Sequence, residues 1–132
     1  MAKRAYLSDE RSQSRAYSRA VVTSGGKTIW LAGQTSSSVA ADLDAQVREI
    51  FTKLDQTIKG AGGSGLRDMV TMTVFINDPR HGDRFVALRK EIFGDSFPAS
   101  ALITVFGFAR PGILVEVQGV AISQEGEPVN GV

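Results

Sequence analysis

The sequence predicts an α+β domain in which two helices cover one face of a single mixed sheet, with the element order ββαβαββ. Two observations support this prediction. Two segments with helical periodicity are separated by a β-branched run, and the last two strand-like runs follow each other at the carboxyl end. Because 132 residues is a usual size for one domain, we treat 1–132 as one unit, with 1–15 and 124–132 peripheral.

The first two strands are expected within residues 20–33. Two short runs of β-branched and aromatic residues flank Ser24-Gly25-Gly26-Lys27, and glycine can adopt the positive φ that tight turns require. This pattern predicts a β-hairpin. Trp30 alternates with apolar neighbours in the second run, so we expect it in the core.

The first helix is expected over 42–59, where apolar residues recur at steps of three and four. These residues are Leu43, Val47, Ile50, Phe51, Leu54 and Ile58. The following "GAGGSG" (60–65) superficially resembles a phosphate-binding loop, but such loops open a helix, whereas this one closes a helix. We interpret it as a helix end and linker.

The second half of the chain contains the remaining elements. The run 69–76 alternates as a strand, and 77–79 has the composition of a turn. An amphipathic helix is expected over 82–93, followed by strands near 102–106 and 114–123. With both helices on one face, the other face of the sheet is left uncovered, which predicts self-association.

Composition limits the classes of function. The chain has no cysteine and one histidine, His81, which excludes thiolate chemistry, cysteine-ligated zinc and histidine-rich metal clusters; we expect no metal. Fifteen basic and fourteen acidic residues give a net charge of +1, so no nucleic-acid partner is expected. No run is long and apolar enough for a membrane span, and no targeting signal is visible, so we expect a cytoplasmic protein.

Two polar residues interrupt the apolar run of the last strand. Glu116 and Gln118 are two positions apart and therefore point to the same face. A carboxylate there must be exposed or held in a polar pocket, because an unpaired buried carboxylate is costly. Phe106 adjoins the glycine-interrupted end of the preceding strand, where it is a candidate for a pocket wall.

Several motifs together resemble the Rid family, also called YjgF/YER057c/UK114, whose members are small trimeric enamine and imine deaminases and their relatives. The motifs are "AYSRAV" (16–21), "LAGQ" (31–34), "MVTMTVFIND" (69–78), "FGDSFPAS" (93–100) and "VEV" (115–117). The resemblance implies a chorismate-mutase-like fold, a homotrimer packed through its sheets, and pockets at the subunit interfaces. It also implies that Tyr17, Gly33 and Glu116 are retained site residues.

Four positions depart from the pattern that the resemblance implies. The arginine that holds the substrate carboxylate is replaced by Ser100, a position that is often cysteine holds Leu102, a helix position that is often asparagine holds Val86, and the last-strand glutamate is Gln118. Without the arginine fork, we expect a substrate other than the standard 2-aminoacrylate. The alternatives are a neutral or more apolar substrate, or a carboxylate held by Arg19, Arg89 or Arg110.

The resulting expectation is a small-molecule hydrolase or deaminase acting on an imine, enamine or related substrate. Such hydrolysis needs no cofactor, because an imine carbon is already electrophilic. The expected catalytic residues are Tyr17, Glu116 and Gln118, and the expected substrate-binding residues are Gly33, Val86, Ser100, Leu102, Phe106 and Arg110. The alternatives are a non-catalytic trimer that binds a small metabolite and, less favoured by the charge, an endoribonuclease or translation inhibitor.

Overall fold

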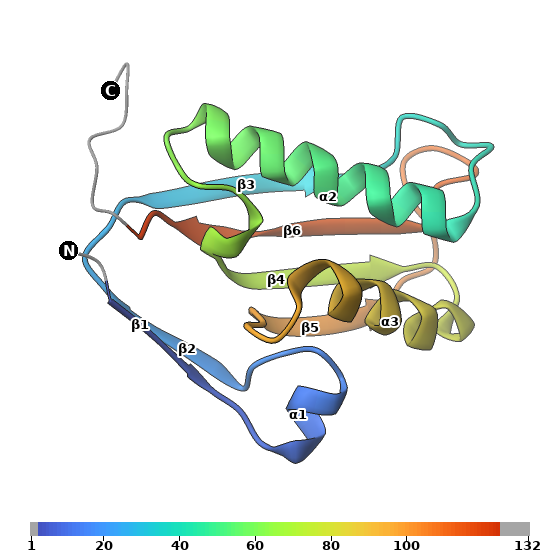
Figure 1. The fold of residues 1–132 in the computed structure, drawn as a ribbon. Coiled ribbons are helices and arrows are strands. Elements are labelled where there is room, and N and C mark those ends of the chain that lie inside the picture. The colour runs from blue at the N-terminus through green and yellow to red at the C-terminus, as the bar shows by residue number, and fades with distance from the viewer. Residues whose placement is uncertain (1–2, 125–132) are drawn as a thin grey trace.

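The computed structural model describes residues 3–124 and confirms the predicted α+β architecture: two long helices lie on one face of a mixed four-stranded sheet (Figure 1). The elements, in chain order, are β1 (Lys3–Leu7), α1 (Glu10–Ser14), β2 (Ala20–Ser24), β3 (Thr28–Gln34), α2 (Leu43–Gly60), η1 (Leu66–Asp68), β4 (Met69–Ile76), η2 (Pro79–His81), α3 (Gly82–Phe93), β5 (Ala99–Thr104) and β6 (Val115–Ile122). Of the predicted tail, all but the first residue lies outside the described range.

The strand order in the main sheet is β3-β6-β4-β5. β6 pairs antiparallel with both β3 and β4, whereas β4 and β5 are parallel. Parallel neighbours need a crossover, and α3 provides it between β4 and β5. β3 and β5 therefore form the two edges of the sheet.

The predicted hairpin is wrong in its pairing. β2 pairs antiparallel with β1 in a separate two-stranded sheet, and β3 pairs with β6. Gly25 and Gly26 have positive φ of 74° and 80°, as a turn requires. The turn is tied to the end of β6, because Lys27 N donates to Ser123 Oγ at 2.9 Å and Ser123 N donates to Lys27 O at 3.0 Å. β2 pairs with the strand that precedes it across α1, and β3 pairs with a strand near the carboxyl end, so neither pairing is encoded by the turn between β2 and β3.

The first fifteen residues contain two elements that the sequence analysis did not assign, β1 and α1. α1 begins with a reciprocal cap: Ser12 N donates to Asp9 Oδ1 at 2.8 Å, and Asp9 N donates to Ser12 Oγ at 3.0 Å. β1 pairs antiparallel with β2 over Lys3 to Leu7. This segment consequently forms part of the site described below.

The two long helices agree with their predicted positions. Asp42 caps α2 by accepting from Ala45 N at 2.9 Å, and Gly94, with φ of 79°, follows the end of α3. β5 begins at Ala99, three residues earlier than expected, and ends at Thr104. It ends there because its partner β4 ends at Ile76, which is paired with Thr104.

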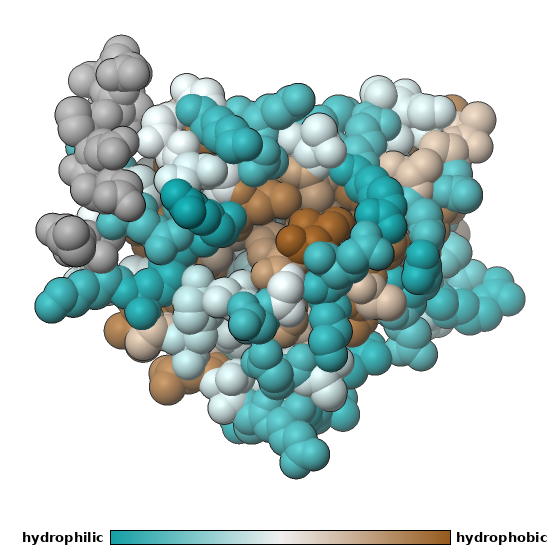
Figure 2. All heavy atoms as spheres, viewed as in Figure 1, coloured by the Kyte–Doolittle hydropathy of each residue, from teal (hydrophilic) through white to brown (hydrophobic). Residues whose placement is uncertain are grey.

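The core lies between the helices and the sheet. Figure 2 shows the helix side of the molecule as largely hydrophilic, with hydrophobic atoms gathered between α2 and α3. Among the described residues, no helix is long and apolar enough to cross a membrane.

The opposite side of the sheet is covered by neither long helix, and we call it the open face (Figure 1). By strand register and alternation, its residues include Trp30, Thr73, Phe75, Ile103, Glu116, Gln118 and Val120. The prediction that Trp30 lies in the core is wrong for this chain by itself, because its side chain is 80% exposed. It alternates with the buried Ile29 and Leu31, which face the helices.

Candidate functional site

Several residues that the sequence analysis singled out line one cavity of about 280 Å³, which we call the α3 pocket. Its lining comprises Arg11, Arg15, Tyr17, Val86, Arg89, Ser100 and Leu102. The pocket lies where α1 and the segment after it meet α3 and the edge strand β5 (Figure 1). Three separate parts of the chain thus build a pocket rich in cationic side chains.

The end of α1 determines where Tyr17 lies. Ala16 adopts the left-handed backbone with φ of 61°, and Tyr17 N donates back to Ser12 O at 3.0 Å. This is the arrangement with which helices commonly end, with alanine in the position that usually holds glycine. The turn leaves the carbonyl of Arg15 free to accept from Arg89 Nη2 at 3.2 Å.

Arg89 is the most unusual residue in the pocket, because its side chain is only 2% exposed. Its Nη1 donates to Ser100 Oγ at 2.7 Å and lies 3.7 Å from Met72 Sδ. The guanidinium carbon also lies 5.2 Å from the centre of the Phe85 ring. Among the described residues, no carboxylate pairs with Arg89, and its Nε has no hydrogen-bond partner.

Burial, and to a smaller extent the nearby charge of Arg15, lower the pKa of Arg89 to about 10. The guanidinium still carries its charge at neutral pH. A buried cation without a carboxylate is costly to keep, and such groups are concentrated at functional sites. The arrangement is therefore suited to attracting an anion.

From the sequence, Arg89 is one of three arginines expected as alternatives for holding a carboxylate. A stronger signal was present in the helical periodicity. Phe85, Leu88 and Ile92 form the apolar stripe of α3, and Arg89 lies on this stripe, four residues after Phe85. A charged residue within the apolar stripe of a helix is the sequence pattern that identifies Arg89 as a buried cation.

Glu116 and Gln118, two of the expected catalytic residues, lie on the opposite side of the sheet from the α3 pocket. Ser100 pairs with Met72, which faces the helices, whereas Gln118 pairs with the neighbouring Thr73. Because alternate strand residues point to opposite faces, Ser100 faces α3, and Glu116 and Gln118 lie on the open face. Within one chain, the sheet therefore separates the α3 pocket from the two polar residues of β6.

Glu116 lies directly against Gly33 at a β-bulge between β3 and β6. A Cβ added to Gly33 would lie 2.5 Å from Glu116 Oε2, so the absence of a side chain at this position makes room for the carboxylate. Glu116 also lines a shallow cavity with Phe75 and Phe108. Gly33 and Glu116 thus form a second cluster, on the open face.

The remaining candidates lie outside the α3 pocket. Phe106 follows β5 and is fully exposed. Arg110 donates to Thr35 Oγ1 at 3.2 Å and to the carbonyl of Ser36, in the loop after β3. Arg19 pairs with Asp9 at 3.2 Å on the surface. Of the three arginines proposed to hold an anion, only Arg89 lines the pocket that contains Ser100.

Over residues 3–124, no group of three or more His, Asp or Glu side chains is arranged to hold a metal ion. The polar atoms of the α3 pocket are mainly hydrogen-bond donors, which suit an anionic or carbonyl-containing organic ligand.

The family model described as Endoribonuclease L-PSP matches residues 8–123. The chain belongs to this family, the Rid or YjgF/UK114 family. The match spans both β2 and the terminal β6, so it includes the α3 pocket and the open face. Members of the Rid family include deaminases and endoribonuclease-like proteins.

Curated relatives of this Rid protein are similar over most of their length. A RutC family protein of Pyrococcus horikoshii is 26% identical over 114 residues, covering 82% of this chain and 87% of the relative. A RutC family protein of Sulfurisphaera tokodaii is 30% identical over 104 residues, covering 74% and 81%.

Solved structures of Rid proteins have the same fold. The Rid family protein YyfB from Yersinia pestis superimposes with a TM-score of 0.77 at 24% identity, covering 90% of this chain and 98% of that protein. A YjgF/YER057c/UK114 family member from Mycobacterium tuberculosis has a TM-score of 0.67 at 27% identity, covering 91% and 99%. The similarity extends over the whole domain.

Proposed function

We propose that this Rid protein is a cofactor-independent hydrolase that deaminates a small imine or enamine bearing an acidic group, in pockets shared by neighbouring subunits of a homotrimer. The observation that carries the proposal is the buried guanidinium of Arg89, which donates to Ser100 Oγ at 2.7 Å in a pocket also lined by Tyr17. By resemblance, Ser100 stands where the family arginine is expected. In this chain the guanidinium beside that position comes from Arg89 on α3, and not from a residue of β5.

Ser100 and Arg89 together form a donor for a carboxylate. Ser100 Oγ accepts from Arg89, and its own hydrogen makes only a long hydrogen bond to the carbonyl of Ala101 at 3.5 Å. The hydroxyl can therefore turn to donate to a ligand, and the adjacent positive charge strengthens that donor. The substrate carboxylate accepts this hydrogen bond and faces the buried charge. The sequence leaves a neutral substrate as an alternative. The pairing of Ser100 with Arg89 supports a ligand with a carboxylate instead.

The chemistry requires groups from both faces of the sheet. Water adds to the imine carbon, a proton passes from the water to the nitrogen, and the carbon–nitrogen bond breaks to release ammonia and a carbonyl compound. Gln118 holds the water, Glu116 receives its proton and returns it to the leaving amine, and Tyr17 closes the pocket. A trimer in which the open face of one subunit covers the α3 pocket of the next brings these groups together.

The apolar character of the open face supports such an assembly. Trp30 is 80% exposed and Ile103 is 43% exposed in the single chain. Large exposed apolar patches mark interaction surfaces. Burial of this face against a neighbouring subunit also removes bulk water from the pocket, which strengthens the attraction between Arg89 and a carboxylate.

The test is an imine-trapping assay, in which an amino-acid oxidase releases imines and semicarbazide competes with the protein for them. We expect the wild type to suppress semicarbazone formation, and Arg89→Gln to reduce this effect about 10- to 100-fold. Gln118→Ala should also lose activity, and so should Tyr17→Ala, which removes the ring that closes the pocket. Arg48→Gln, which removes an exposed arginine paired with Glu91 at 2.6 Å elsewhere, is the matched control.

Two other outcomes select the alternatives. If anions raise the melting temperature of the wild type but not of Arg89→Gln, and no imine is hydrolysed, the protein is a metabolite-binding trimer. The buried charge of Arg89, which has no carboxylate partner, supports this alternative equally. RNA cleavage that is abolished by Glu116→Ala and survives repurification would favour the endoribonuclease function that the family description names.

A further inference from the structure

The α3 pocket contains more positive charge than one carboxylate requires. Arg11, Arg15 and Arg89 all line it. Within residues 3–124, the one carboxylate in ion-pair contact with any of these arginines is that of Asp83, whose Oδ1 lies 2.9 Å from Arg15 Nη1. Three guanidinium groups with one paired carboxylate leave the surroundings of this pocket strongly cationic.

The three arginines differ in depth. Arg89 is 2% exposed and is held by Ser100 and the carbonyl of Arg15, so it forms the base of the pocket. The side chain of Arg15 is 36% exposed, and Arg11 is exposed. These two arginines come from α1 and its carboxyl end and form the rim. One cation is thus fixed inside, and two are accessible above it.

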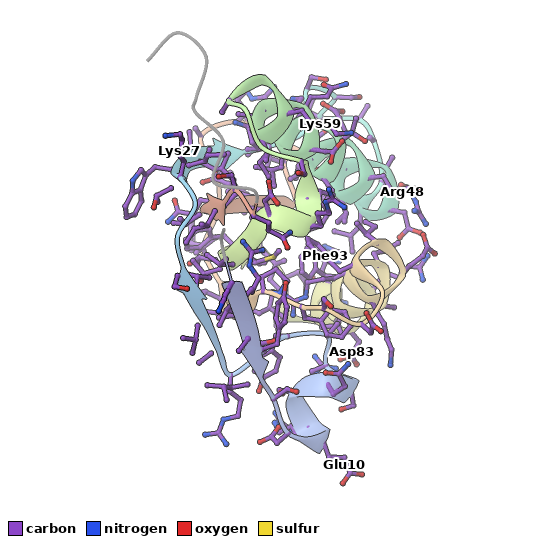
Figure 3. All side chains as sticks on the ribbon, turned by 60° about the vertical axis from the view of Figure 1, so that its left-hand side comes forward. Glu10, Lys27, Arg48, Lys59, Asp83 and Phe93 are labelled. Carbon is purple, nitrogen blue, oxygen red and sulfur yellow. The ribbon has the colours of Figure 1, made fainter. Side chains whose placement is uncertain are left out.

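The pairing of Arg15 is easily exchanged. Its partner Asp83 is 92% exposed, and ion pairs in water contribute little stability. Figure 3 shows Asp83 lying beside α1, whereas Glu10 points away from the rest of the chain. Arg15 can therefore leave Asp83 for an anion in the pocket at small cost.

We infer that the α3 pocket selects substrates with two acidic groups, the first received by Arg89 and Ser100 at the base and the second by Arg15 at the rim. This inference rests on the proposed function and names its substrate class: the imine of a small acidic amino acid. A cavity of about 280 Å³ suits a ligand of that size. A dianion also relieves the repulsion between the charges of Arg15 and Arg89 that the pKa of Arg89 reflects.

The experiment compares binding of two product-like acids with the same carbon skeleton, 2-oxoglutarate and 2-oxopentanoate, by calorimetry at fixed ionic strength. We expect the wild type to bind the diacid about tenfold more tightly. Arg15→Gln should abolish this preference because it weakens binding of 2-oxoglutarate more than binding of 2-oxopentanoate, and Arg15→Lys should retain part of the preference. Asp83→Asn should increase the preference, because it frees Arg15.

The matched control is Arg48→Gln, which removes the same charge from an exposed ion pair outside the pocket and should not change the preference. Circular dichroism checks that each variant is folded. Equal affinity for the two acids, no binding of either, or a preference that persists in Arg15→Gln would overturn the inference.

Failure of this inference can be distinguished from failure of the proposed function. If the protein hydrolyses imines of monocarboxylic amino acids in an Arg89-dependent manner without preferring diacids, the dianion inference alone is wrong. If no imine is hydrolysed, yet the diacid binds through Arg15 and Arg89, the pocket selects dianions without deaminating them.

Discussion

Ser100 and Gln118 project from opposite faces of the same four-stranded sheet. Ser100 pairs with Met72 on the side of α3, and Gln118 pairs with Thr73 on the open face. A single chain cannot bring these side chains to one substrate. The proposed catalytic site is therefore complete only when two copies of the chain meet.

Mixing two inactive variants tests the shared site. Arg89→Met lacks the anion-binding group and Gln118→Ala lacks the water-binding group, and each alone should be inactive in the imine-trapping assay. After co-refolding in equal amounts, about a quarter of the pockets in randomly mixed rings receive both intact halves. We expect about that fraction of wild-type activity. Absence of recovery, with mixed assembly verified by affinity tags, would mean that each site lies within one subunit.

Arg89 should contribute to function at the expense of stability. Arg89→Met replaces the buried cation with an uncharged side chain that has a similar stem, so we expect the free energy of unfolding to stay equal or rise by up to about 2 kcal/mol. Urea denaturation measures the change. Arg89→Ala also removes the packing of the stem and should destabilise instead. A large loss of stability in Arg89→Met would identify a structural residue.

Trp30 should report assembly through its fluorescence, because it is the one tryptophan in the sequence and is 80% exposed in the single chain. Burial of the open face would place the indole in an apolar environment and shift its emission to shorter wavelength. We expect Ile103→Asp, which adds a charge to that face, to dissociate the assembly and shift the emission to longer wavelength. Sedimentation velocity measures the assembly, and Ala87→Asp on the exposed side of α3 is the control.

Glu49 should stabilise the loop after β3 in a pH-dependent manner. Hydrogen bonds from Ser37 and Ser36, together with the ion pair to Lys53 at 3.0 Å, lower the pKa of Glu49 to about 2. A carboxyl group with a lowered folded-state pKa contributes stability above its unfolded pKa and loses it as pH falls toward 2.

We therefore expect Glu49→Gln to lower the melting temperature more at pH 7 than at pH 3. Thermal denaturation by circular dichroism measures both differences. Glu10, which points away from the rest of the chain in Figure 3, provides a Glu10→Gln control with little effect at either pH. A change in melting temperature on Glu49→Gln that is the same at both pH values would contradict a lowered pKa of Glu49 in the folded protein.

Much of the secondary structure was predictable because it depends on local patterns. The apolar stripes of α2 and α3, the cap at Asp42 and the glycine after α3 all act within a few residues, so their boundaries agree with the structure. The alternation in β6 also predicted that Glu116 and Gln118 share a face. These features follow from helix and strand periods alone.

The sequence by itself determined the two long helices, the strands of the main sheet and its uncovered face, because periodicity and turn chemistry act over short distances. The tertiary structure decided which strands pair, so β2 lies beside β1, and it also decided that Arg89, from the apolar stripe of α3, reaches Ser100 on β5. Such contacts join segments far apart in the chain, and they form only when burial of the common core brings those segments together.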